Sequence, residues 1–490
     1  MFTEPLRQLA ERLDFHPVKI YEFVKNTIRY EPYSGSLKGA AQTLLEGAGN
    51  DIDIASLLVA LLRISRFPTR YIIGEVTLEK EKALSWLKVH DLRVAGQLLA
   101  SNEIPVTLLL EDGQPAALQL EHVWVETYIP FGNYRGSGSD PSIRRWSPLD
   151  ASFKTHTFSP RRNVLVEAGV DVASILAILD QAVEQDASGA VISLNTAQLE
   201  DVMQAALTQV ESHAKLTSPD AFINEFRGVW VINKQTQGIL PATIPMRINR
   251  VLKRTARLDD DVHHKLRIQL SFWPYGLAQP EEFGGLNLLE IDFTAPTALI
   301  AGKRLTLSYR PATPDDQVVI DEFGGRLTVP PYLVRLRPQL LLDGQRVGEK
   351  QVDDITMGLP ENLWYQLIPP RQMQGELIEN VVTAGSFYAF GFDLGTVPAR
   401  QVKTLFFELA NRLKTLPTRT ETEVVSDTLL GAALQLTAMA YWAQADFLNK
   451  VAVNPAELHL QRLPFTDQQQ DCGKPEEKIR VALRHSDTDK

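Results

Sequence analysis

Hydrophobic residues near the start of the chain recur at helical spacing. Five of them fall at positions i, i+3, i+4, i+7 and i+8, namely Ile54, Leu57, Leu58, Leu61 and Leu62. This spacing places five apolar side chains on one stripe of a helix, which is typical of a helix packed into a hydrophobic core. We therefore predict a buried helix that begins near Asp51.

Two acidic residues at the predicted helix start have two interpretations. Asp51 and Asp53 can accept hydrogen bonds from the unpaired N–H groups of the first turn, and a capping Asp stabilises a helix by about 0.5–2 kcal/mol over Ala. The helix dipole also favours an anion with a chemical role at this position. The local pattern alone leaves capping and chemistry open.

Residues 122–129 alternate in polarity and are rich in β-branched and aromatic side chains, which predicts a strand that ends at Pro130. His122 and Trp124 lie on one face of this strand. Asp150 ends the next strand-like segment, where a carboxylate can orient an imidazole. A lone strand histidine is more often structural, but with this acid nearby we expect His122 and Asp150 to line a site.

Five blocks in a fixed order carry a resemblance to a known family. The blocks are residues 20–30, 49–63, 67–74, 121–126 and 146–150. Together they resemble the bacterial transglutaminase-like superfamily, over residues 1 to about 153. The resemblance implies a papain-like fold, in which a helix carrying the nucleophile packs against an antiparallel sheet carrying His and Asp.

The sequence departs from this family at the nucleophile. In the family, the nucleophilic Cys lies four residues before the Ala that opens an Ala-x-Leu-x-x-Ala-Leu-x-Arg run, and that position here is Asp51. By resemblance, Asp51 takes the place of the nucleophile, His122 that of the general base and Asp150 that of the acid that orients the imidazole. Cys472, the only cysteine, lies in a polar stretch and cannot easily supply the missing thiol.

Further residues near these three are expected to bind a ligand in the cleft: Asn50, Asp53, Trp124 and Tyr33. The blocks are also similar to a bacterial subgroup found near the start of very large proteins, some with Rhs/YD repeats that resemble secreted toxins or surface adhesins. In that subgroup the nucleophile position is often Asp. The resemblance therefore implies a stable variant of the domain.

Two functions of different class follow from the exchange of Cys for Asp. The first is a degenerate module that binds or scaffolds a protein or peptide in the cleft of a secreted or surface protein, because a carboxylate attacks amides poorly. The second is a hydrolase or an acyl- or amide-transfer enzyme in which Asp51, His122 and Asp150 transfer protons. Thiol-dependent transglutaminase or protease activity is not expected from either.

Composition limits the partners. The chain has 490 residues and a formal net charge of −10, which argues against nucleic acid or an anionic membrane as the main partner. One cysteine excludes an internal disulfide. The first residues lack a charged and then apolar signal region. The compartment stays open between the bacterial cytoplasm and, for a fragment of an exported protein, the cell surface or exterior.

No cofactor is expected from the motifs. His263 and His264 are neighbours on a predicted strand, so their side chains point to opposite faces and cannot easily hold one metal ion. The longest apolar run, residues 429–443, is shorter than the roughly twenty residues that a membrane-spanning helix needs. We predict a buried helix there.

The remaining pattern predicts an α+β multidomain protein. We expect a transglutaminase-like domain at residues 1–160, a helical connector at 161–238, a β-rich, sandwich-like domain at 239–395 and a helical segment at 396–452. Strands are predicted at residues 264–272, 305–309 and 339–342, with an Asp-Gly turn after the last. A polar tail at 453–490 is expected to be poorly ordered.

Overall fold

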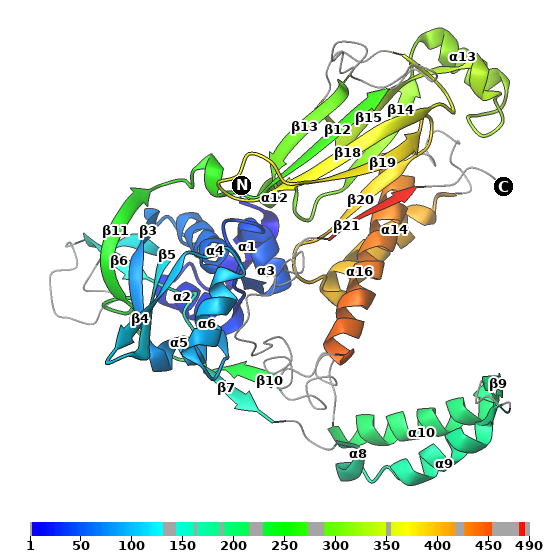
Figure 1. The fold of residues 1–490 in the computed structure, drawn as a ribbon. Helices are drawn as coiled ribbons and strands as arrows, with labels where there is room; N and C mark the ends of the chain where they lie inside the picture. The colour runs from blue at the N-terminus through cyan, green and yellow to red at the C-terminus, as the bar shows by residue number, and fades with distance from the viewer. Residues whose placement is uncertain are drawn as a thin grey trace. The chain divides into compact units, whose positions relative to one another are not determined.

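The computed structural model describes residues 2–130, 144–160, 164–185, 187, 191–214, 229–272, 289–348, 354–416, 426–452 and 480–485. The chain divides into two compact units (Figure 1). The first contains residues 1–155, 232–446 and 471–490, and the second contains residues 156–231 and 447–470. The segment around Cys472 lies outside the described residues.

The N-terminal part of the first unit begins with helices α1 (Glu4–Arg12), α2 (Pro17–Thr27), α3 (Gly39–Glu46) and α4 (Asp51–Ile64). Short strands β1 (Arg29–Tyr30) and β2 (Ala48–Gly49) pair in parallel between them. The helix predicted from the apolar stripe is confirmed as α4, and it is buried from Asp53 to Leu62. The burial extends all round the helix because α1, α2 and α3 pack against it.

An antiparallel sheet lies on the other side of α4. Its strand order is β11-β3-β5-β4, and β6 pairs with the far end of β5. The strands are β3 (Thr69–Glu79), β4 (Val106–Glu111), β5 (Gln114–Pro130), β6 (Arg144–Leu149) and β11 (Arg247–Thr255), and helices α5 (Lys80–Leu87) and α6 (Leu92–Ala100) follow β3. The predicted strand that ends at Pro130 is confirmed as the second half of β5.

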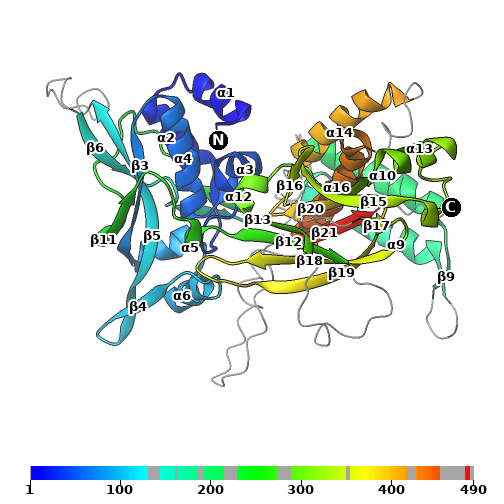
Figure 2. The same ribbon diagram turned by 90° about the horizontal axis from the view of Figure 1, so that it is seen from above.

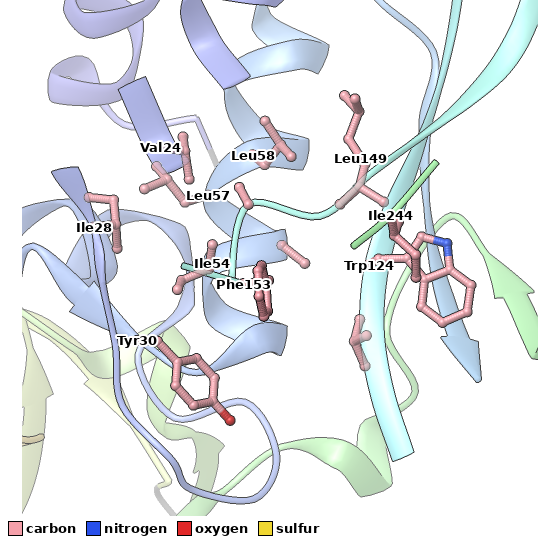
Figure 3. Packing of buried hydrophobic residues seen from close by; sticks show 14 of the residues in the cluster. Val24, Ile28, Tyr30, Ile54, Leu57, Leu58, Trp124, Leu149, Phe153 and Ile244 are labelled. Atoms are coloured by element: carbon pink, nitrogen blue, oxygen red, sulfur yellow. The ribbon is translucent and has the colours of Figure 1, made fainter. Parts of the chain in front are cut away.

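A continuous hydrophobic core joins α4 to this sheet. Figure 3 shows Leu57 and Leu58 of α4 on the side of the core opposite Trp124 and Leu149. Each of these four residues is at most 1 % exposed. This packing fixes the start of α4 close to the middle of β5, and it determines which polar side chains meet there.

Strand β11 joins a different sheet from the one that the sequence predicts. It lies inside the range 239–395 expected for the β-rich domain, yet it pairs antiparallel with β3, with Val251 opposite Gly74. The apolar pattern of the strand is local and carries no information on which sheet edge it joins. The N-terminal sheet therefore contains a strand from far along the chain.

Two further antiparallel sheets form the β-rich part of the first unit (Figure 2). One has the order β13-β12-β18-β19 and is made of β12 (Lys265–Phe272), β13 (Leu289–Pro296), β18 (Pro360–Ile368) and β19 (Glu376–Thr383). The other has the order β16-β15-β14-β20-β21, and β17 pairs with β15; its members are β14 (Leu305–Pro311), β15 (Arg335–Leu342), β16 (Gln345–Val347), β17 (Ile355–Thr356), β20 (Tyr388–Asp393) and β21 (Arg480–His485). Their apolar faces share one core.

The three strands predicted in this region are confirmed. Leu266, Ile268 and Leu270 of β12 are at most 1 % exposed, as their alternation predicts. Asp343 and Gly344 have positive φ angles of 49° and 81° and join β15 to β16 as a tight hairpin. Short helices α12 (Thr297–Ile300) and α13 (Pro314–Glu322) and the 3-10 turns at Asp260–Val262 and Pro331–Leu333 connect the strands.

Strand β21 differs from the expectation of a poorly ordered tail. Residues 480–485 pair antiparallel with β20, with Phe390 opposite Leu483. Apolar residues alternate through Val481 and Leu483, a short pattern that the polar composition of the surrounding segment hides. The edge of β20 offers backbone hydrogen-bonding groups, and residues 480–485 pair with them. The rest of the tail lies outside the described residues.

Helices end the described part of the first unit. They are α14 (Ala399–Leu413), a π-helical turn at Asp427–Gly431 and α16 (Ala432–Ala452), whose last residues belong to the second unit. The apolar run at 429–443 thus falls on helical structure, as predicted. Within the described ranges, no helix is long and apolar enough to cross a membrane.

The second unit is mainly helical, as the periodicity predicts. It contains β7 (His156–Ser159), α8 (Val164–Glu167), α9 (Val172–Ala182), β8 (Val183–Gln185), β9 (Val191–Leu194), α10 (Thr196–Ala214) and β10 (Val229–Ile232), whose last residue belongs to the first unit. Strands β8 and β9 form a hairpin between the two longer helices, and β7 pairs with β10.

Candidate active site

Asp51 is the first residue of α4, and its carboxylate reaches across to β5. One oxygen accepts a hydrogen bond from the backbone N–H of Ile52 at 3.0 Å, and the other accepts from the N–H of Val123 at 2.8 Å. Asp51 is not the N-cap residue, although it accepts a hydrogen bond from the one N–H group of Ile52 in the first turn. Asn50 is the N-cap, and its side-chain oxygen accepts from the N–H of Asp53 at 2.8 Å. Both acids follow the capping position, which corrects the capping interpretation.

His122 lies between two carboxylates. Its Nδ1 is 3.1 Å from Oδ2 of Asp51, and its Nε2 is 3.1 Å from Oδ2 of Asp150. The first contact is an ion pair that is not aligned as a hydrogen bond, and the second has hydrogen-bond geometry. The His122 and Asp150 side chains are 1 % exposed, whereas that of Asp51 is 14 % exposed. The three residues singled out from the sequence therefore meet, and Asp51 is the most accessible of them.

The segment after β6 holds Asp150 in place. Its second oxygen, Oδ1, accepts hydrogen bonds from the hydroxyl of Ser152 at 2.6 Å and from the backbone N–H groups of Ser152 at 2.8 Å and Phe153 at 3.3 Å. Tyr21 of α2 donates its hydroxyl to the backbone carbonyl of Asp150 at 3.0 Å. These bonds fix the carboxylate before any ligand arrives.

Two tryptophans enclose the imidazole. The ring of Trp124 is stacked at 6.4 Å from that of His122, and Trp86 presents its edge at 5.9 Å. Gly74 lies opposite His122 in the ladder between β3 and β5. A Cβ at Gly74 would lie 2.7 Å from the Trp124 ring, so the absence of a side chain makes room for the stacked indole.

The carboxylates determine the charge of the imidazole. Burial alone lowers the pKa of His122, but the charges of Asp150 and Asp51 and the hydrogen bond with Asp150 outweigh it and raise the pKa to about 10. Burial alone raises the pKa of Asp150, while the charge of His122 and the hydrogen bonds from His122 and Ser152 move it well below its usual value. At neutral pH the arrangement is therefore an imidazolium between carboxylates.

The other residues expected to bind a ligand have different surroundings. Asn50 and Asp53 are completely buried and bind the protein itself: the Asn50 amide donates to the carbonyls of Tyr33 and Gly35 at 2.8 and 2.6 Å. Trp124 is 1 % exposed behind His122. Only Tyr33 lines the cleft, and its hydroxyl donates to Asp53 at 2.8 Å. Asn50, Asp53 and Trp124 therefore hold the site in place from the protein interior and do not face a ligand.

A narrow cleft leads to Asp51. Its walls combine aromatic, apolar and charged side chains from the N-terminal sheet and helices with loops of the β-rich part, including Tyr30, Ile104, Leu120, Glu121, Pro370 and Arg371. Arg371 forms an ion pair with Glu121 at the rim. A Cβ on Gly35 would overlap the Pro370 ring at 2.1 Å, so the loop around residue 370 lies directly on the N-terminal domain.

Backbone bonds attach the cleft wall to the β-rich part. The N–H of Ser36 donates to the carbonyl of Val262 at 2.8 Å, and the N–H of His264 donates to the carbonyl of Ser36 at 2.9 Å. The His264 ring contacts the carbonyl oxygen of Ser34 at 2.8 Å. Within the described residues, no group of three or more His, Cys, Asp or Glu side chains is arranged to hold a metal ion.

A comparison with protein families identifies the N-terminal part of the chain. Residues 3–151 match the transglutaminase-like superfamily. The N-terminal part of the chain is thus a transglutaminase-like domain, and the whole chain has mixed α/β content. No curated protein matches the chain significantly.

Three residues around the candidate site were not found from the sequence. Ser152, Trp86 and Arg371 contact the three site residues or the cleft rim, and they come from three separate segments. Ser152 follows Asp150 by two residues, a spacing that permits a hydroxyl to bond back to the carboxylate. Arg371 had no local signal because a distant loop brings it to the cleft.

The contacts of the His122 ring limit the reactions that this domain can catalyse. Both ring nitrogens of His122 face carboxylates, so the ring holds its proton at neutral pH and is a poor base. Asp51 offers an accessible carboxylate to a cation, or a base to a water molecule. Direct attack of Asp51 on an amide would form a mixed anhydride with expulsion of a basic amine, which has a high barrier.

Proposed function

We propose that the transglutaminase-like domain is a binding module that holds a peptide segment in the cleft, with a basic side chain of the peptide opposite Asp51. In this proposal Asp51 stands at the position of the nucleophilic Cys and acts as a fixed anion. The observation that carries the proposal is the position of the His122 ring between the Asp51 and Asp150 carboxylates, 3.1 Å from each. A thiolate–imidazolium pair has the same charges, but a carboxylate lacks the nucleophilicity of sulfur.

The lining of the cleft supports the proposal of a peptide ligand. Aromatic and apolar side chains such as Tyr30, Ile104 and Leu120 offer packing surface, while Asp51 and Glu121 add negative charge. Apolar walls with a few charged groups are typical of ligand sites in proteins. Because His122 is 1 % exposed and Asp51 is 14 % exposed, an incoming ammonium or guanidinium group meets the carboxylate first.

A peptide selection tests this proposal. A library of random peptides is selected on the whole protein, and the affinity of the recovered peptides is measured by fluorescence anisotropy. Asp51→Asn keeps the shape of the side chain and removes its charge, so we expect at least about tenfold weaker binding, or 1.4 kcal/mol. Asp112→Asn, at an exposed turn with φ of 50° that Asn tolerates, is the matched control.

The selection also has contrary outcomes. Equal affinity of the wild type and Asp51→Asn for every recovered peptide would place the ligand outside the cleft. Recovered peptides without Lys or Arg would contradict the proposed role of Asp51 as a partner of a cation.

A hydrolase or an acyl- or amide-transfer enzyme is the second candidate, and the 3.1 Å contact between Asp51 and His122 favours it. In that case Asp51 takes a proton from water or an amine, and the imidazolium stabilises the developing anion. Turnover of peptide amides or esters by the wild type, lost in folded Asp51→Asn, would establish this function and displace the binding module.

Substitution of Cys for Asp51 tests the proposed descent of the site. Asp51→Cys is made in a Cys472→Ser background so that one thiol remains. Because the helix start and His122 favour a thiolate, we expect alkylation by iodoacetamide at pH 6 to be faster than that of a free peptide thiol. A rate equal to that of the free thiol would contradict the proposal that Asp51 stands at the nucleophile position.

A further inference from the structure

A second cavity, separate from the cleft, lies between α2 of the transglutaminase-like domain and the segment from Ile232 to Pro245. It has a volume of about 220 Å³, several times the ~30 Å³ that one water molecule occupies in the liquid. Its lining is largely polar and includes Tyr21, Lys25, Lys154, Asn233, Gln235 and Thr243. Lys25 and Lys154 are its charged members, in a chain whose net charge is −10.

Both lysines are buried. Lys25 is 8 % exposed and Lys154 is 1 % exposed. The ammonium of Lys25 donates to the Tyr21 hydroxyl at 3.3 Å, and that of Lys154 donates to the carbonyl of Ala151. Within the described ranges, neither forms an ion pair with a carboxylate. Each ammonium has three N–H donors, so most of their donor capacity is left for a ligand.

The nearest carboxylate, Asp150, does not neutralise these lysines. Its oxygens already bind His122, Ser152 and the N–H of Phe153. Burial lowers the pKa of Lys154 to about 7. The negative charge of Asp150 acts in the opposite direction, and the positive charges of Lys25 and Lys88 lower the pKa further. An unpaired buried ammonium is costly, and an anion beside it removes that cost.

The cavity wall is preorganised. The segment around Gln235 is held to α2 because the Asn26 amide donates to the Gln235 carbonyl at 2.9 Å and accepts from its N–H at 3.0 Å. The N–H of Asn233 donates to the carbonyl of Thr155 at 2.9 Å. The lining of this cavity thus combines side-chain amides and hydroxyls with two ammonium groups, which are donors that oxyanions accept hydrogen bonds from.

We propose that this cavity binds a small oxyanion through the ammonium groups of Lys25 and Lys154. The oxyanion is a phosphate-type group or a carboxylate, which share the same acceptor chemistry. Tyr21 connects the cavity to the active site, because its hydroxyl receives a bond from Lys25 and donates to the Asp150 carbonyl. The inference does not depend on whether the cleft binds a peptide or catalyses a reaction.

Titration calorimetry of the full chain at pH 7 and low ionic strength tests the proposal. Sulfate is the first probe because its charge is constant at this pH, and phosphate and acetate then distinguish the two sources of the oxyanion. We expect saturable binding of one anion per chain. Lys25→Gln and Lys154→Met each weaken it about tenfold or more, whereas Lys25→Arg retains it. Lys80→Gln, an exposed lysine of α5, is the matched control for lost charge.

Proton uptake gives an independent readout. With its pKa at about 7, Lys154 is half protonated at pH 7, so sulfate binding takes up about half a proton per chain. Calorimetry in two buffers of different ionisation enthalpy measures this uptake. Lys25→Gln should reduce it at saturating sulfate, because loss of the Lys25 charge raises the pKa of Lys154 in the free protein.

The proposal is overturned if none of the three anions binds saturably to the wild type, or if Lys25→Gln binds them as tightly as Lys80→Gln does. Lys25 is the less buried of the two lysines, so the pair Lys25→Gln and Lys25→Arg decides the outcome even where Lys154→Met does not fold.

Discussion

Two carboxylates two residues apart on α4 have opposite surroundings. Asp53 is completely buried, and its oxygens accept five hydrogen bonds at 2.8–3.0 Å, from the hydroxyls of Tyr33 and Ser36 and from three backbone N–H groups of residues 37–39. Asp51 accepts from two N–H groups, faces His122 and opens to the cleft. The Asp53 carboxylate thus binds only groups of the protein itself, whereas the Asp51 carboxylate can still bind a ligand.

The start of α4 can therefore serve both structure and function. Asp53 ties the loop before α3 to α4, and the same loop is bound to the β-rich part through Ser36. Asp51 can remain partly open because its neighbour supplies this attachment. The comparison yields predictions that separate the two roles.

The largest effect is expected for Asp53→Ala. The substitution leaves the N–H groups of Leu37, Lys38 and Gly39 without their acceptor in a buried place, so we expect a loss of about 3–5 kcal/mol in the free energy of unfolding. Urea denaturation followed by circular dichroism measures it, with Asp53→Asn as a milder variant. A loss below about 1 kcal/mol in Asp53→Ala would contradict the structural role.

Asp51→Ala is expected to cost less, about 1–2 kcal/mol, because its carboxylate is partly exposed and holds two N–H groups. The pKa of His122 should fall, since one of its two carboxylates is lost. Urea denaturation gives the first quantity and an NMR titration of the His122 ring gives the second. An equal loss of stability for Asp51→Ala and Asp53→Ala would end the distinction between the two acids.

The pH dependence sharpens the comparison. The pKa of His122 is about 10 in the folded protein and its usual value is 6.5, so His122 contributes stability that is complete below pH 6.5 and is lost as the pH rises through 10. Asp51→Asn weakens this contribution. The stability difference between the wild type and Asp51→Asn should therefore shrink from pH 6.5 to pH 10, as measured by urea denaturation at fixed ionic strength. A difference that is constant over this range would show that Asp51 does not act through His122.

The smallest effect is expected for Arg371→Ala at the cleft rim. Its ion pair with Glu121 is half exposed, so we expect a change of about 0.2–1 kcal/mol in stability. Affinity for a peptide selected on the wild type should change more than stability does, because the guanidinium borders the cleft. Thermal denaturation and anisotropy compare the two. Unchanged affinity would show that Arg371 of the β-rich part does not contribute to the ligand site.

The sequence predicted the local parts of this arrangement. The apolar stripe determined α4, alternation determined the strand that carries His122, and the order of the blocks related Asp150 to His122. The first two features depend on neighbours within one element, whereas the third depends on the resemblance of the blocks to a family. The local pattern at the helix start did not distinguish Asp51 from Asp53, and only the family resemblance separated them. The two acids differ in which distant groups reach them.

Tertiary structure alone decided the rest. The pairing of β11 with β3, the strand at residues 480–485, the position of Arg371 beside Glu121 and the burial of Lys154 all depend on contacts between segments far apart in the chain. The periodicity of side chains records which face of an element is buried. It does not record which partner buries that face, and the free energy of a buried charge depends on that partner.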